Sequence, residues 1–364
     1  MAGRGDPPEG TPEGLPGGGE DEYGSVVFDE SFVRAARLQE FSARERMGDH
    51  ARAVRSRPGW RVWTGAKQAV LLVLLIAVAF GTAIYMGVRH PYQPAPAQPA
   101  EALRSMVIPL APQGPVPGGD PARLYARSPA AEYRSGGAGI TLPAARPTRN
   151  FSESQVMTAL TIAKDYLVDS SLDPAVLNGT STRPVRALLD PDQIEQFDRS
   201  VDAPTNDGRH AATGWLVRFD PAKTKLADPE IRVHGTLRVT DAGPNTLEVA
   251  SDHTFTYALQ PADTAPRVND ASLFTVRREL HFRFDRDDLR THRAELLSSY
   301  TQAGPMACAA DPSGALEPLL AGQRATGTGP AGTDPYQTGR TAAAFCGSLA
   351  PGAQPAAAPA QPTT

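Results

Sequence analysis

The feature that most constrains this chain is an uncharged, strongly apolar stretch over residues 68–88, which reads QAVLLVLLIAVAFGTAIYMGV between Lys67 and Arg89. About 20 apolar residues in a helix are long enough to cross the hydrocarbon core of a bilayer. A buried helix of a soluble protein is the alternative, but such a helix usually keeps a polar stripe. A cleaved signal peptide fits poorly, because it begins near residue 1 and its apolar region is shorter. The sequence therefore predicts one transmembrane helix over 68–88.

The distribution of lysine and arginine around this stretch predicts its orientation. Lysine and arginine collect on the cytoplasmic side of membrane helices. After the stretch, Arg89 is followed by no lysine or arginine until Arg104. Five such residues lie shortly before it, namely Arg52, Arg55, Arg57, Arg61 and Lys67. The prediction is a single-pass protein of the cell membrane, in contact with the lipid bilayer, with a cytoplasmic N-terminus and an extracytoplasmic C-terminal part.

Changes in composition divide the chain into seven segments. Acidic, Gly- and Pro-rich sequence cannot bury enough apolar surface to fold, and proline-rich sequence favours an extended spacer. The basic segment before the apolar stretch either fixes the topology or binds a partner. The predicted segments are a disordered acidic tail (1–27), a basic cytoplasmic juxtamembrane segment (28–67), the transmembrane helix (68–88), a Pro/Ala-rich linker (89–148), an extracytoplasmic domain (149–305), a loop region (306–350) and a disordered tail (351–364).

The periodicities within residues 149–305 predict an α+β domain. Ser152 and Gln155 fit a capping box, and apolar residues at helical spacing behind them predict a helix that ends near Val168. Two shorter helical pieces begin at Asp173-Pro174 and Asp190-Pro191. Strict alternation then predicts an antiparallel sheet, with strands over 213–219, 230–240, 246–260 and 273–285. Residues 286–304 allow a helix or a last strand over 294–302, and we favour the strand because it gives the preceding strand a hairpin partner.

This order of elements resembles the curved cone of nuclear transport factor 2-like proteins, in which a strongly curved antiparallel sheet wraps around a helix and can leave a pocket. An open sheet with helices on one face is the alternative. The whole chain also resembles single-pass membrane proteins of streptomycetes and related actinobacteria, through the runs FDESFVRAARLQEFSARERM, FTVRRELHFRFDRDDL and QAGPMACAADP. No activity comes with that resemblance, so it implies no catalytic residues.

Two polar residues interrupt the apolar face of the predicted sheet. His253 and Arg278 fall on the apolar parity of their strands. A buried arginine is costly unless it is paired, and a polar pair on a concave face is what a ligand pocket would use. The hypothesis is a ligand pocket lined by His253, Tyr257 and Arg278. A bulge that turns the side chains outward, or an acidic partner for Arg278 on a neighbouring strand, would explain the same pattern structurally.

The two cysteines, Cys308 and Cys346, lie on the predicted outer side, where oxidising conditions allow a disulfide between them. No histidines stand beside them at the spacing of a zinc site. The run Asp285, Asp287 and Asp288 lacks the glycine and the later glutamate of a calcium hand. We therefore expect no metal and no cofactor, and the formal net charge of -4 does not point to nucleic acid.

The sequence carries no catalytic signature. It contains no Walker-type phosphate loop, no G-x-S-x-G elbow and no H-E-x-x-H pair. The predicted function is a membrane-anchored, non-enzymatic binding or assembly module of the cell envelope, with an envelope protein as partner. An enzyme that acts on a small envelope molecule in the cone pocket is the alternative, although no inward acid is evident near His253. Signalling across the membrane is a third interpretation.

Overall fold

The computed structural model describes residues 62–89, 100–263, 270–326, 332–337 and 345–356. The predicted acidic tail and the basic segment up to residue 61 lie outside these residues. The chain divides into two compact units, Met1–Pro94 and Ala95–Thr364, and each is considered by itself.

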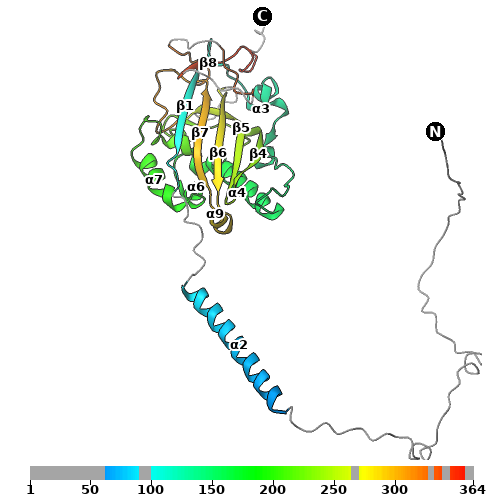
Figure 1. Cartoon of the computed structure of the whole chain (residues 1–364). Helices are drawn as coiled ribbons and strands as arrows, with labels where there is room; N and C mark the ends of the chain where they lie inside the picture. Colours follow the sequence, from blue (N-terminus) through cyan, green and yellow to red (C-terminus); the bar gives the residue numbers. More distant parts are fainter. Residues whose placement is uncertain (1–61, 90–99, 264–269, 327–331, 338–344, 357–364) are drawn as a thin grey trace, which may run out of the picture. The chain divides into compact units, whose positions relative to one another are not determined.

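In the first unit, the apolar stretch forms the 28-residue helix α2, Val62–Arg89 (Figure 1). Its large apolar side chains are exposed, with exposed fractions between 49% and 68%. Across the described parts of the chain, no helix combines the length and the apolar character needed to cross a membrane. This finding contradicts the predicted transmembrane helix over 68–88 and, with it, the single-pass topology and the cell-membrane localisation.

The second unit is built on one mixed sheet of eight described strands, in the order β2-β4-β5-β6-β7-β1-β8, with β3 paired to β5. Strands β4 to β7 form an antiparallel meander, in which β4, β5 and β6 match the strands that the alternation predicted over 230–240, 246–260 and 273–285. Strand β1 runs parallel to both β7 and β8. The bounds are β1 Arg104–Ala111, β2 Arg134–Ser135, β3 Thr224–Leu226, β4 Arg232–Gly243, β5 Thr246–Pro261, β6 Ser272–Phe284, β7 Glu295–Gly304 and β8 Gly347–Ser348.

Short helices connect these strands, and one long helix covers a face of the sheet (Figure 1). The long helix, α4, begins at the predicted capping box, where the Ser152 N–H donates to Gln155 Oε1 (2.9 Å) and the Gln155 N–H donates to Ser152 Oγ (3.3 Å). The helices are α3 Pro121–Ala126, η2 Pro129–Glu132, η3 Gly136–Gly139, α4 Glu153–Ser171, α5 Pro174–Leu177, α6 Arg183–Ala187, η4 Pro191–Gln193, α7 Ile194–Asp202, α8 Ala212–Trp215 and α9 Arg286–Thr291.

The main core lies between α4 and the inner face of the sheet, which we define as the face that α4 covers. Leu160 and Ala163 of α4 are fully buried, as are Val249 of β5 and Phe282 of β6. The ring of Phe282 packs edge-on against Tyr166 of α4, with ring centroids 5.3 Å apart. The helical and alternating periodicities therefore identified the two surfaces that form this core.

The sheet differs from the expected nuclear transport factor 2-like cone, which is antiparallel throughout and is not observed here. The difference arises at β1, which lies within the predicted linker 89–148 and adds a parallel strand to β7. Its residues Ile108, Leu110 and Ala111 are almost fully buried. Prolines around this short apolar run concealed it, because proline-rich sequence usually indicates a spacer.

Two further segments refine the strand predictions. The strand predicted over 213–219 is wrong: the structure has the short helix α8 there, followed only by an isolated bridge between Phe219 and Leu316. The last strand is confirmed as β7, and the short helix α9 precedes it, so residues 286–304 contain both of the predicted alternatives. A capping box of Asp285 and Asp288 starts α9, so the acidic run that was interpreted as a turn forms the beginning of a short helix.

The C-terminal segment folds back over the outer face of the sheet, opposite α4. The predicted Cys308–Cys346 disulfide is present. Directly after it, β8 pairs with the end of β1, and Leu349 packs with Ile108 and Leu110. Residues near Tyr336 cover the middle of the same face, where the Tyr336 hydroxyl lies 2.7 Å from Thr275 Oγ1. The loop region 306–350 thus completes the core in its described parts.

Candidate functional site

The residues predicted to line a pocket lie together on the inner face of the sheet. The register of β5 and β6 is regular, and it places His253 opposite Arg278 and Tyr257 opposite Phe274. His253, Tyr257 and Arg278 are each 0% exposed. The interpretation of their parity was therefore correct, and no bulge turns them outward.

Arg278 joins the sheet to the ends of two helices. Its Nη1 donates to Ser170 Oγ (2.8 Å) and Ser171 Oγ (2.9 Å) at the C-terminus of α4. Its Nη2 donates to the carbonyl oxygens of Gly214 (3.3 Å) and Trp215 (2.9 Å) in α8. Burial lowers the pKa of Arg278, and the partial negative charge of a helix C-terminus favours its charged form. These contacts assign Arg278 a role in holding the fold together.

Tyr257 reaches the same helix end. Its hydroxyl donates to the Ser171 carbonyl oxygen (2.8 Å), one of the last acceptors of α4. An acidic partner on the neighbouring strand is found for the preceding residue and not for Arg278. On the outer face, Arg277 binds Asp252 through two hydrogen bonds of 2.8 Å. Neighbouring arginines of β6 are thus stabilised in different ways, one by helix carbonyls and hydroxyls and the other by a carboxylate.

His253 packs tightly against β4. Its Nδ1 lies 2.8 Å from Ser251 Oγ, and its ring covers Gly235, where an added Cβ would come within 2.5 Å of the ring. Burial lowers the pKa of His253 to about 4, so the imidazole is neutral at neutral pH. A neutral, enclosed imidazole with a hydroxyl as its hydrogen-bond partner is poorly placed for proton transfer to a substrate.

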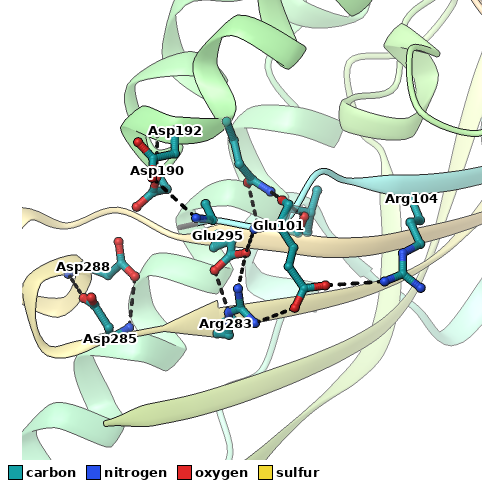
Figure 2. A network of polar contacts seen from close by, with 11 residues as sticks. Glu101, Arg104, Asp190, Asp192, Arg283, Asp285, Asp288 and Glu295 are labelled. Carbon is teal, nitrogen blue, oxygen red and sulfur yellow. Dashed lines mark hydrogen bonds and ion pairs between the residues drawn. The ribbon is translucent and has the colours of Figure 1, made fainter. Parts of the chain in front are cut away.

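A polar network at the end of the sheet near α9 fixes the start of β1 (Figure 2). Arg283 Nε and Nη2 donate to the two carboxylate oxygens of Glu295, each at 2.6 Å, and Nη1 donates to Glu101 Oε1 (2.9 Å). Gln193 Nε2 donates to the Glu101 carbonyl oxygen (2.6 Å). Glu101 belongs to the predicted linker, and no local signal indicated its distant partners. The network therefore anchors the residues that enter β1.

Asp288 stands beside this network at the start of α9. Its Oδ2 accepts the Asp285 N–H (3.0 Å) and its side chain is 7% exposed. Burial is the main reason that the pKa of Asp288 is raised to about 7, and the carboxylates of Asp285 and Asp190 add to this effect. Asp288 is therefore an acid that titrates near neutral pH because of its tertiary surroundings.

The free energy of unfolding of the wild-type protein should fall as the pH rises, because Asp288 must lose its proton while buried. We expect Asp288→Asn to abolish this pH dependence. Between pH 4 and pH 7 the folded state keeps a proton on Asp288 that the unfolded chain releases, so the wild-type free energy of unfolding falls across this window. Relative to the variant, the wild-type protein should lose about 2 kcal/mol between pH 5 and pH 8. Urea unfolding at both pH values measures this loss. Asp287→Asn, at the exposed neighbour, is the control, and equal pH dependence in all three proteins would refute the prediction.

The described surface also contains a groove beside β1, which we call the β1 groove. It has a volume of about 470 Å³. Two of its apolar side chains are unusually exposed, Met106 at 43% and Phe345 at 85%. Asp207 provides a carboxylate at its polar side, and the hydrogen bond from His210 holds the pKa of that carboxylate far below its usual range. The lining residues are Ser105, Met106, Val107, Pro109, Asn206, Asp207, Gly208, Cys308, Ala310, Pro312 and Phe345.

The β1 groove exposes an edge of the sheet. The Ser105 N–H points away from β7 and donates to the Gly208 carbonyl oxygen (2.8 Å). Backbone groups alternate in direction along a strand, so the N–H and C=O of Val107 face the same side. Pairing with β8 begins only at Leu110. Among the described residues, β1 therefore has no neighbouring strand on this side between Ser105 and Leu110.

A second depression, of about 500 Å³, lies between Asn150 and the turn that contains Asp241. Hydrogen bonds of 2.9 and 3.0 Å from Asn150 to Asp241 already bridge it. Within the described ranges, no cluster of His, Cys, Asp or Glu side chains is arranged to hold a metal ion. The β1 groove is thus the better candidate site, and no sequence pattern indicated it because its walls come from four distant segments.

Comparison of the chain with protein families, curated proteins and solved structures found no match.

Proposed function

We propose that this protein is a non-enzymatic binding or assembly module that holds an extended segment of a partner protein in the β1 groove. The observation that carries this proposal is the unpaired stretch of β1 beside two exposed apolar side chains. An unpaired strand edge can bind an added strand through main-chain hydrogen bonds, and flanking pockets select its side chains. The N–H and C=O of Val107 are the groups available for this pairing.

The walls of the groove suggest the chemistry of the partner segment. Met106 and Phe345 favour apolar side chains, since burial of apolar surface is the main source of affinity. Asp207 remains ionised because His210 and the Arg209 N–H donate hydrogen bonds to it, so it favours a basic residue on the partner. The proposed partner segment is therefore extended, apolar along one face and basic at one end.

The interior gives less support to the enzyme alternative. A catalytic pocket around His253 would need space and an acid within hydrogen-bond reach. The hydrogen bonds described for His253, Tyr257 and Arg278 instead connect them to Ser251 and to the ends of α4 and α8.

Site-specific photocrosslinking in cells tests the proposal. A photoreactive residue is placed at Met106 in the groove or, as the matched control, at Met157 of α4, whose exposure of 41% is nearly the same. We expect a defined protein adduct at position 106 and none at position 157. Purification and mass spectrometry would identify the crosslinked partner and the peptide at the junction.

The groove variant Met106→Asp is expected to reduce binding of the partner identified in this way by about tenfold, since one buried interface anchor is typically worth 1–2 kcal/mol. Met157→Asp should leave binding unchanged. Equal adducts at both positions, or no adduct at position 106 when the protein is abundant and folded, would refute the proposal. An adduct peptide with no extended apolar segment would refute the proposed mode of binding.

A further inference from the structure

A group of buried polar atoms without partners lies between the sheet and α8. The side-chain atoms are Arg278 Nε, Ser299 Oγ, Thr301 Oγ1 and Ser105 Oγ, and none has a hydrogen-bond partner among the described residues. Arg278 is opposite Thr301 in the β6–β7 pair, and Ser299 is opposite Ser105 in the β7–β1 pair. Because Ser299 and Thr301 are two residues apart on one strand, they share a face. The four side chains therefore form one patch across three adjacent strands.

Helix α8 covers this patch on the side that faces away from the sheet. The Gly214 carbonyl oxygen accepts a hydrogen bond from Arg278 Nη2, and an added Cβ on Gly214 would lie 2.5 Å from the Ser105 Cβ. The exposed fractions of Arg278, Ser299 and Thr301 are 0%, 2% and 1%. The patch is therefore enclosed, although Ser105 also lines the β1 groove on its other side.

The patch combines hydrogen-bond donors with an unmatched positive charge. A guanidinium Nε–H can only donate, and serine and threonine hydroxyls can donate. No acidic side chain forms an ion pair with Arg278 in the described part of the chain, and the titratable groups close to its guanidinium are the phenols of Tyr166 and Tyr257. Burial raises the pKa of both phenols, so both are neutral. A buried charge is costly without an opposite charge nearby.

We propose that this patch binds a small monovalent anion of the size of chloride. The anion accepts hydrogen bonds from Arg278 Nε and from the hydroxyls of Ser299 and Thr301, and it neutralises the buried guanidinium. A fully buried site favours an ion that loses its hydration shell readily, so chloride and bromide should bind better than fluoride. Large organic anions are excluded because α8 packs directly against β1 at Gly214 and Ser105.

Thermal unfolding of the full-length protein tests this proposal at constant ionic strength, with chloride exchanged for gluconate. We expect the melting temperature to rise by about 3 °C, with saturation, as chloride increases from well below to about ten times its dissociation constant. Bromide should act similarly and fluoride weakly. Equal melting temperatures in chloride and gluconate would overturn the proposal.

Two hydroxyl deletions provide a specific control. The combined variant Ser299→Ala and Thr301→Val should lose the dependence on chloride, whereas Thr236→Val, at an exposed threonine of β4, should keep it. An unchanged dependence in the combined variant would place the anion elsewhere and overturn the assignment. In crystals grown with bromide, an anomalous peak within hydrogen-bond distance of Arg278 Nε is expected, and a water molecule at that position would refute the anion.

Discussion

Replacement of Arg278 by alanine is expected to lower the free energy of unfolding by about 3–5 kcal/mol, because each buried polar group left without a partner costs about 1–3 kcal/mol. The guanidinium makes four hydrogen bonds of 2.8–3.3 Å, to two hydroxyls and two carbonyl oxygens. These acceptors lie in α4 and α8, so the alanine variant loses the contacts that hold both helix ends to β6. Urea unfolding followed by circular dichroism measures the loss.

Two further substitutions separate the charge of Arg278 from its hydrogen bonds. Arg278→Met keeps much of the volume and removes the cost of burying a charge, so its loss of stability should be smaller than that of the alanine variant. Arg238→Ala, at an exposed arginine of β4, should change the free energy of unfolding by less than about 0.5 kcal/mol. If Arg278→Ala is as stable as Arg238→Ala, Arg278 does not hold the helices to the sheet.

Removal of the Cys308–Cys346 disulfide is expected to lower the free energy of unfolding by about 2–4 kcal/mol. The bond closes a loop with a sequence separation of 38 residues, for which the chain-entropy estimate is about 4 kcal/mol. It also precedes β8 directly, so it keeps Leu349 packed on Ile108 and Leu110 of β1. We therefore expect the C-terminal segment to open first when the bond is absent.

The double variant Cys308→Ser and Cys346→Ser, compared with the oxidised wild-type protein by urea unfolding, measures this loss. Wild-type protein treated with a reducing agent should unfold at the same midpoint as the double variant, which is the control for the substitutions themselves. Hydrogen exchange should show the largest loss of protection at β8. An unchanged midpoint would mean that packing alone holds this segment on β1.

Local sequence signals predicted the longest elements of the second unit, namely the helix α4 and the strands β4, β5 and β6. Ser152 and Gln155 identified the start of α4, because a capping box involves only residues three apart in the chain. The alternation of apolar residues predicted β4, β5 and β6 and placed His253 and Arg278 on the inner face, since side chains alternate strictly between the two faces of a strand. The pairing of Cys308 with Cys346 followed from their being the only two cysteines.

Contacts between distant segments decided the rest. Strand β1 lies in proline-rich sequence, and only its parallel pairing with β7 and the bonds from Arg283 to Glu101 make it part of the sheet. The role of Arg278 depends on where α4 and α8 end, and the pKa of Asp288 depends on its burial beside Asp190.

Neighbouring residues and strict periodicity were enough to predict the start of α4, the faces of β4 to β6 and the apolar character of α2. The tertiary structure alone decided the parallel edge strand, the contacts of the buried polar residues and the β1 groove. The walls of that groove come from segments around residues 105, 207, 310 and 345. No local pattern brings these segments together, since their proximity follows from strand order and from the disulfide.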